Sequence, residues 1–316
     1  MLYHFSNNIF KQTAGIVWYN FKSIFIFIIL GNVAYLCDQI LGMHMVAIPV
    51  IPVTILGGGL AIFLAIRNNA AYDRWWEARK IWGQIVNTSR HFGSQVMAYL
   101  TMRHAGPDLN ETRLAELQKR MINRHIAWIN ALRLSLRMKD NWEEIKKYLT
   151  PEEYAKLLSA PNKATQINHF QALDLTHALN LGAIEDFRHL GMMTSIKDFY
   201  DQQGKCERIK KTVFPFYYTY FTGVFLWMFI ILLPFTLVGH MNYLSVPLSV
   251  AISFAFYILD KTGNITEEPF ENRASDIPMT SLCRTIEVDM LHQLGEEKLP
   301  EPIAREYTKF GAEFLR

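Results

Sequence analysis

The segment Ile51–Gly83 reads IPVTILGGGLAIFLAIRNNAAYDRWWEARKIWG and changes abruptly from an apolar half to a charged half rich in tryptophan. The change falls at Arg67, directly after Ile66. About 20 apolar residues in a helix are long enough to cross the ~30 Å hydrocarbon core of a bilayer. A chain with such a junction must satisfy two solvents, so we predict that this segment leaves a membrane near Arg67 and continues in water.

Four apolar runs have membrane length or nearly so: Phe21–Ile40, Val46–Ile66, Val213–Val238 and Leu244–Leu259. Pro49, Pro52 and three glycines are expected to interrupt the second run. No signal-cleavage motif follows the first run, which we interpret as a retained membrane helix. The chain is predicted to consist of five parts: an N-terminal arm (1–20), membrane helices 1 and 2 (21–66), a cytosolic helical domain (67–212), membrane helices 3 and 4 (213–260) and a cytosolic C-terminal segment (261–316).

The distribution of positive charge predicts the topology. None of the 32 Lys and Arg residues lies in the turns Asp38–Met45 and Gly239–Tyr243. All of them fall before, between or after the apolar runs, on the side opposite these two turns. Cytoplasmic loops carry the excess of Lys and Arg in membrane proteins. Both termini and the middle region are therefore predicted to be cytoplasmic.

The middle region shows the periodicity of amphipathic helices and no strand alternation. Apolar residues recur at helical spacing between Leu114 and Leu136, and the pattern continues in Leu173–Phe187 and Met192–Lys210. Thr150 followed by Pro151 is a helix N-cap signal. The predicted fold class is all-α, with four transmembrane helices and a large cytosolic helical region.

Catalytic and metal-binding motifs are missing from the sequence. It contains no HExxH, no Gly-x-Ser-x-Gly and no phosphate-binding glycine loop. His125 stands alone on a helix and is expected to pack or face solvent, and Cys37, Cys206 and Cys283 are too far apart to suggest a disulfide or zinc framework. A net charge of +3 gives no argument for nucleic acid. We predict that the protein is not an enzyme and that it binds no cofactor and no metal.

A channel fits the apolar runs better than a transporter, which usually has more helices and charged sites at the midplane. Gly58, Ile62 and Ile66 are spaced by four residues and share one helix face. A ring of isoleucines can close a pore because water is poorly stabilised in a narrow apolar neck. Four helices enclose little pore alone, so a ring of subunits is implied. The alternative is that Ile62 and Ile66 face lipid or other helices and that the glycines only allow close packing.

Three long motifs resemble those of bacterial bestrophins. They are RNNAAYDRWWEARKIWG after IFLAI, CERIKKTVFPFYYT at Cys206–Thr219, and EEPFENRASDIP at Glu267–Pro278 followed by SLCRTIEVDM. The resemblance covers nearly the whole chain in the same order. It implies a homopentameric ion channel in the bacterial inner membrane, with four membrane helices per subunit, a long cytosolic helical region and one axial pore.

The resemblance also implies where the pore narrows. Its neck of three apolar residues falls on Gly58, Ile62 and Ile66, where Gly58 departs from the bulky residue that relatives carry. A second restriction at the cytosolic exit falls near Phe187, with Ile184 as its neighbour. The motif residues Asp73, Arg74, Glu77 and Arg79 are expected to form ion pairs that fix the cytosolic helices and the subunit contacts, and Trp75, Trp76 and Trp82 to act as interfacial or packing anchors.

Animal bestrophins carry an acidic calcium clasp, which this chain is expected to lack. Glu268 and Asp276 remain, but Arg273 stands where an acidic ligand would be expected. Calcium takes six to eight oxygen ligands and tolerates a cation in its shell poorly.

The predicted function is passive flow of small monovalent ions through a hydrophobic neck gate. Chloride and other anions are the first candidates, because animal and plant bestrophins conduct them and the chain has a basic surplus. Two alternatives stay open: a monovalent-cation channel of the same architecture, since bacterial bestrophins of that selectivity are known, and a membrane scaffold that does not conduct. The predicted partners are four further copies of the chain, the lipid bilayer and the permeant ions, and no nucleic acid.

Overall fold

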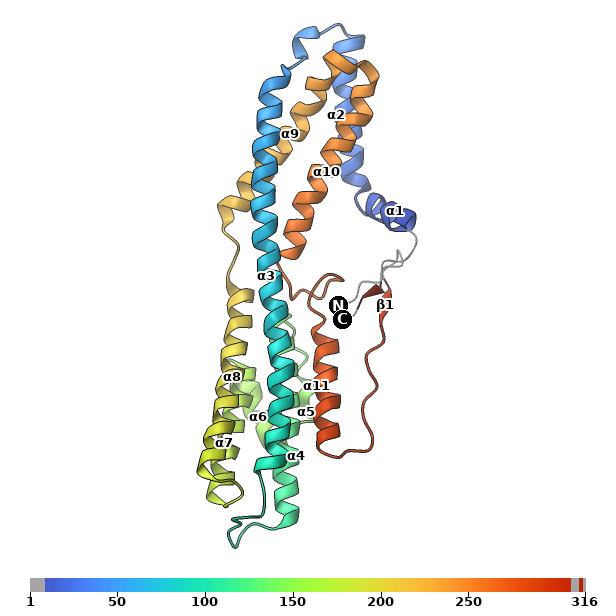
Figure 1. Ribbon diagram of the computed structural model, residues 1–316. Helices are drawn as coiled ribbons and strands as arrows, with labels where there is room; N and C mark the ends of the chain where they lie inside the picture. The colour runs from blue at the N-terminus through green and yellow to red at the C-terminus, as the bar shows by residue number, and fades with distance from the viewer. Residues whose placement is uncertain (1–8, 308–312, 315–316) are drawn as a thin grey trace.

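The computed structural model describes residues 9–307 and 313–314 and is built from helices in two end-to-end bundles (Figure 1). The upper bundle of Figure 1 contains α2 (Phe21–Tyr35), the first half of α3 (Val50–Tyr99), α9 (Phe216–Met241) and α10 (Ser245–Thr266). The lower bundle contains the second half of α3 together with the helices α4 (Glu111–Leu136), α7 (Lys163–Asn180), α8 (Asp186–Lys211) and α11 (Met279–Gln293).

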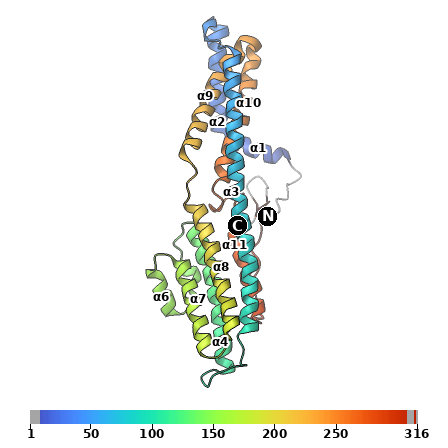
Figure 2. The ribbon, with the colours of Figure 1, turned by 60° about the vertical axis from the view of Figure 1, so that its left-hand side comes forward.

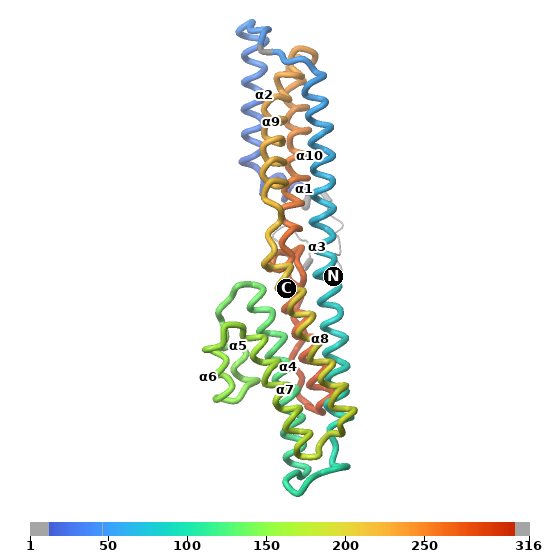
Figure 3. The backbone as a smooth tube through the Cα atoms, turned by 90° about the vertical axis from the view of Figure 1, so that its left-hand side faces the viewer, coloured from blue at the N-terminus to red at the C-terminus, as the bar shows by residue number. Residues whose placement is uncertain are grey.

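The remaining elements are short. Helix α1 (Ile9–Tyr19) leaves the base of α2 at a steep angle, and α5 (Glu143–Lys146) and α6 (Pro151–Ser159) stand at the side of the lower bundle (Figures 2 and 3). The connecting turns are η1 (Leu36–Ile40), η2 (His44–Val46) and η3 (Asn242–Leu244). The all-α prediction is confirmed for the described residues except for two antiparallel two-residue strands, β1 (Glu306–Tyr307) and β2 (Glu313–Phe314).

Helix α3 is the axis that joins the two bundles. Its 50 residues correspond to about 75 Å at 1.5 Å per residue. The expected interruption of its apolar half is wrong. Pro49 is the N-cap and Pro52 lies in the first turn, where backbone N–H groups have no intrahelical acceptor to lose. The expected boundary after Ile66 therefore falls inside a continuous helix.

Each bundle has its own apolar core. In the upper bundle, Phe27 of α2, Leu60 and Leu64 of α3 and Phe229 of α9 are buried together. The core of the lower bundle is larger and includes the fully buried Trp82 of α3. The outer surface of the upper bundle is also apolar, with exposed side chains that include Ile26, Ile29, Val33, Phe63, Phe221, Val224, Trp227 and Leu248. Exposing such a large apolar surface to water would be strongly unfavourable.

Capping explains two of the helix starts in the lower bundle. The Thr150 hydroxyl accepts a hydrogen bond from the Glu153 backbone N–H, and the Glu153 carboxylate accepts one from the Thr150 N–H, which completes a capping box and confirms the predicted start of α6. The Asn110 side chain caps α4 by accepting a hydrogen bond from the Arg113 backbone N–H.

The expected helix over Leu173–Phe187 is interrupted in the structure. Helix α7 ends at Asn180, and α8 begins only at Asp186. Gly182 has φ +72°, and a Cβ there would lie 2.1 Å from the backbone oxygen of His104. Only glycine fits this turn, which stops the helix whatever the apolar periodicity around it.

Candidate ion pathway along helix α3

The three predicted neck residues lie on one exposed face of α3. Ile62 and Ile66 are 64% and 54% exposed in the single chain, and nothing lies within 4 Å of a Cβ placed on Gly58. The opposite face of the helix is packed: Leu60 and Leu64 are buried. The structure therefore separates a face that holds the subunit together from a face that has no partner within the described chain.

This exposed face continues along the full length of α3, and we call it the α3 stripe. Its members recur every three or four residues and are all exposed: Ile51, Ile55, Gly58, Ile62, Ile66, Asn69, Asp73, Trp76, Lys80, Gln84, Asn87, His91, Ser94 and Ala98. The spacing follows the 3.6-residue turn of the helix. The stripe is apolar through Ile66 and mostly polar from Asn69 onward, so its chemistry changes at the junction seen in the sequence.

Arg67, the first charged residue after the neck positions, does not lie on the stripe. It is buried between α3 and α10, where its Nη1 donates to Oδ1 of Asp260 at 2.7 Å. Its Nη2 donates to Asn264 Oδ1 and lies 3.5 Å from Oε2 of Glu267. Next to it, Asn68 Nδ2 donates to the backbone oxygen of Leu259 at 3.1 Å. These contacts fix α3 to α10 directly below Ile66.

Arg74 and Glu77 tie α3 to α8. Arg74 donates to the backbone oxygens of Thr212 and Ile209, and Glu77 accepts from Arg208 Nη2 at 2.6 Å. An ion pair was expected for both, and only Glu77 makes one among the described residues, whereas Arg74 caps the carboxyl end of α8. Such capping by a distant arginine is a tertiary contact that the sequence does not signal.

The tryptophans behave as packing anchors to different degrees. Trp82 is fully buried, and Trp75 donates from Nε1 to the Ser275 backbone oxygen at 3.0 Å. Trp76 stacks on Tyr72 with 6.5 Å between ring centroids and is 45% exposed on the α3 stripe. Trp76 therefore belongs to the exposed α3 stripe rather than to the core.

The two residues expected at the cytosolic exit differ in accessibility. Ile184 is buried in the loop between α7 and α8, while Phe187 in the first turn of α8 is 90% exposed. Between them, Glu185 Oε1 lies 2.7 Å from His104 Nε2, and Arg188 lies 3.7 Å from the other carboxylate oxygen. The hydrogen bond from His104, reinforced by Arg188, lowers the pKa of Glu185. The loop is thus held in place beside Phe187.

The residues that match the animal calcium clasp contact Arg273. Its guanidinium lies 3.4 Å from Glu268, and its backbone N–H donates to Asp276 Oδ2 at 3.0 Å. Burial raises the pKa of Asp276 to about 6. Among the described residues, no group of three or more His, Cys, Asp or Glu side chains could hold a metal ion.

Three stretches of the described chain are long and apolar enough to cross a membrane: Phe21–Ile40, Val50–Tyr99 and Asp186–Thr266. The last of them includes both α9 and α10. The upper bundle has an apolar core and an apolar exterior, and α3 connects it to the lower bundle. This arrangement is that of an integral membrane protein with a large part outside the bilayer.

Comparison with known proteins agrees with this class. Residues 5–292 match the model of the bacterial and fungal bestrophin proteins, and the chain belongs to the bestrophin family. The predicted family is therefore confirmed, and with it the expectation of a channel-family protein rather than an enzyme.

Relatives and solved structures extend the match over most of the chain. The chain is 34% identical over 253 residues to the voltage-dependent anion channel-forming protein YneE of Escherichia coli K12, covering 80% of this chain and 79% of that protein. A similarly named protein of Mesorhizobium japonicum is 27% identical over 78% of this chain and 75% of its own length. A crystal structure of a bestrophin homologue from Klebsiella pneumoniae superposes with a TM-score of 0.78 at 26% identity, covering 87% of this chain and 98% of that one.

Proposed function

We propose that this chain is one subunit of a homopentameric channel that passes small monovalent ions through a pore lined by α3. The α3 stripe carries the proposal. It runs the full length of α3, changes from apolar to polar after Ile66, and is exposed throughout in the described subunit. A ring of subunits with this face inward would produce a neck of apolar side chains above a polar vestibule.

The proposed gate consists of Ile62 and Ile66, with the smaller Gly58 at the outer end. Rings of isoleucine would expel water from a narrow neck and so raise a barrier to ions without blocking the pore sterically. Because Gly58 has no Cβ and open space around it, the neck is wider at that level. Phe187 is the proposed side chain at the exit aperture, since Ile184 is buried within the subunit.

The proposed setting is the bacterial inner membrane, with four helices crossing it and both termini in the cytoplasm. The apolar exterior of the upper bundle and the absence of Lys and Arg from residues 23–66 and 212–260 support this orientation. Chloride and other small anions are the first candidates, because relatives are named as anion channel-forming proteins. The apolar neck itself discriminates little between ions of opposite sign.

The test is single-channel recording of purified protein in planar bilayers. We expect Ile62→Ala and Ile66→Ala to carry larger unitary currents than the unmodified protein, because removing the apolar barrier lets water remain in the neck. Ile29→Ala is the matched control: it truncates another exposed isoleucine (44%) on α2, away from the α3 stripe. It is expected to leave the current unchanged.

Three outcomes would count against the proposal. Currents of unmodified size in both neck variants would show that the neck lies elsewhere. Complete absence of unitary currents and of liposome ion flux in every variant would favour a non-conducting membrane scaffold. The subunit number is measured separately by native mass spectrometry, where any state other than five copies would contradict the pentamer.

A further inference from the structure

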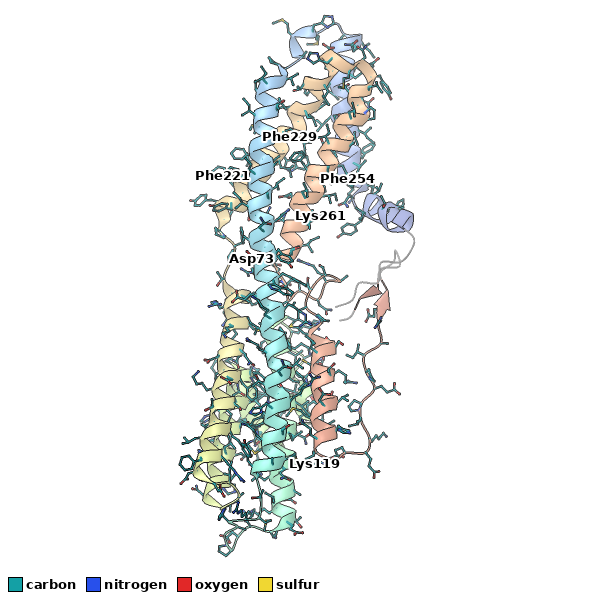
Figure 4. All side chains as sticks on the ribbon, viewed as in Figure 1. Asp73, Lys119, Phe221, Phe229, Phe254 and Lys261 are labelled. Carbon is teal, nitrogen blue, oxygen red and sulfur yellow. The ribbon has the colours of Figure 1, made fainter. Side chains whose placement is uncertain are left out.

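The charges on the α3 stripe are few and ordered. Below Ile66 the stripe carries one acidic residue, Asp73, and one basic residue, Lys80. Asp73 follows Ile66 by seven residues, and Lys80 follows Asp73 by another seven. Each interval is two helical turns, or about 10.5 Å along the axis. Figure 4 shows Asp73 on α3 at the level between the two bundles.

Asp73 is exposed, and no hydrogen bond or ion pair joins it to another residue that the structure describes. The cations nearest to it in the helix are directed elsewhere. Arg67 is buried against Asp260, and Arg74 caps α8. The acidic Glu77, one turn further on, is paired with Arg208 at 2.6 Å. The stripe therefore presents an uncompensated carboxylate closest to the neck, although basic residues are more numerous in the sequence around it.

We infer that Asp73 is a determinant of ion selectivity at the inner end of the neck and that Lys80 opposes it. This inference rests on the proposed pentameric pore. Five copies of Asp73 would form a ring of carboxylates about 10.5 Å below Ile66 along the helix axis. Rings of acidic side chains concentrate cations and deplete anions, and the effect is strongest where the walls are close. Lys80 would form a basic ring two turns further from the neck.

The two rings make opposite predictions. Neutralising Asp73 favours anion entry into the neck from below, and neutralising Lys80 favours cation entry. Asp73 lies closer to the constriction, so its effect is expected to be the larger of the two. The anion preference suggested by the names of relatives would then be opposed in this chain by a residue of its own pore face.

The experiment measures reversal potentials of purified channels in planar bilayers under an NaCl gradient. We expect Asp73→Asn to lower the ratio of sodium to chloride permeability several-fold and Lys80→Gln to raise it. Asp73→Glu keeps the charge and is expected to retain the unmodified ratio. Glu77→Gln is the matched control, because it removes a carboxylate from the same helix at a paired position off the stripe.

Ionic strength supplies a second readout. The Debye length is ~30 Å at 0.01 M salt and ~3 Å at 1 M, so the difference between Asp73→Asn and the unmodified channel is expected to shrink as salt rises. A purely structural role for Asp73 would show no such dependence. Each variant is also measured in combination with Ile62→Ala, so that a closed neck does not prevent measurement of the permeability ratio.

The outcomes distinguish this inference from the proposed function. An unchanged permeability ratio in Asp73→Asn, in channels whose currents respond to Ile62→Ala, would overturn the role of Asp73 and leave the channel intact. An equal shift in Glu77→Gln would also overturn it, because the effect would then come from general surface charge. No current in any variant would overturn the channel itself and the selectivity inference with it.

Discussion

Nη1 of Arg67 lies 2.7 Å from Oδ1 of Asp260, a residue 193 positions further along the chain. The Arg67 side chain is 1% exposed and the Asp260 side chain 15%. This contact joins the helix that carries the proposed neck to the last helix of the upper bundle. Asn264 of α10 and Glu267, directly after the end of α10, complete the site. The position of Ile66 is therefore set by a buried charge network one residue away.

Removing one member of this network is expected to destabilise the fold strongly. Arg67→Met leaves the largely covered carboxylates of Asp260 and Glu267 without their buried cation, and breaking a buried pair costs about 3–5 kcal/mol. The measurement is the free energy of unfolding in detergent by chemical denaturation. Arg90→Met is the control, since the Arg90–Asp289 pair is exposed and is expected to be worth less than about 1 kcal/mol. Equal losses in both variants would contradict the structural role of Arg67.

Gly57 and Gly58 are neighbours in the chain with opposite surroundings. A Cβ on Gly57 would lie 2.7 Å from Cε2 of Phe229, whose ring is buried between α3 and α10 (Figure 4). Gly57→Ala is expected to cost about 1–3 kcal/mol, because the core has no room for the methyl group. Gly58→Ala is expected to stabilise α3 by about 0.5–1 kcal/mol. Thermal unfolding of the two variants checks both signs, and equal melting temperatures would contradict the assigned faces.

The open space at Gly58 gives a further expected result in the proposed pore. Gly58→Ile restores a bulky third ring at the outer end of the neck. We expect the variant to fold as well as the unmodified protein and to carry a smaller unitary current. Gly59→Ile is the control on the same helix, because nothing lies within 4 Å of that position either and it is off the stripe. A reduced current in both variants would indicate a general effect of replacing glycine in this helix.

His125 is packed inside the lower bundle, as expected for a lone histidine on a helix face. Its ring lies 4.5 Å from Phe199 and 5.2 Å from Trp128 between centroids. The Ser89 hydroxyl donates its proton to the Ile85 backbone oxygen, so Nε2 of His125 carries a proton and donates to Ser89 Oγ at 2.8 Å. Burial lowers the pKa of His125 from 6.5 to about 3.

The lowered pKa of His125 predicts a loss of stability in acid. Between about pH 6.5 and 3 the unfolded state binds one proton more than the folded state at this residue, so its contribution falls as pH falls, by up to about 1.4 kcal/mol per pH unit. Asp276, with its raised pKa, acts in the opposite direction between about pH 6 and 3.8. The measurement is therefore the difference in unfolding free energy between the unmodified protein and His125→Phe across this range. A difference independent of pH would contradict the buried neutral histidine.

Several features of the fold follow from local properties of the sequence. Apolar runs of membrane length, the one-sided distribution of Lys and Arg, and the capping signal at Thr150 each depend on residues close together in the chain. The three bestrophin motifs are likewise contiguous, and the family model matches as they predicted. Helix spacing also placed Gly58, Ile62 and Ile66 on one face without regard to what surrounds that face.

Only the tertiary structure decided which face of α3 is buried, because that depends on helices brought against it from elsewhere in the chain. In the structure Gly57 faces the core, whereas Gly58 faces open space. Arg67 pairs with Asp260, and Arg74 caps the end of α8. Asp73 lies on the exposed stripe and has no ion pair among the described residues. At the proposed exit Ile184 is buried and Phe187 is exposed, on either side of the start of α8 after the turn at Gly182. The sequence determines the charge and hydrophobicity of each side chain, but the partner of each side chain depends on packing between distant segments.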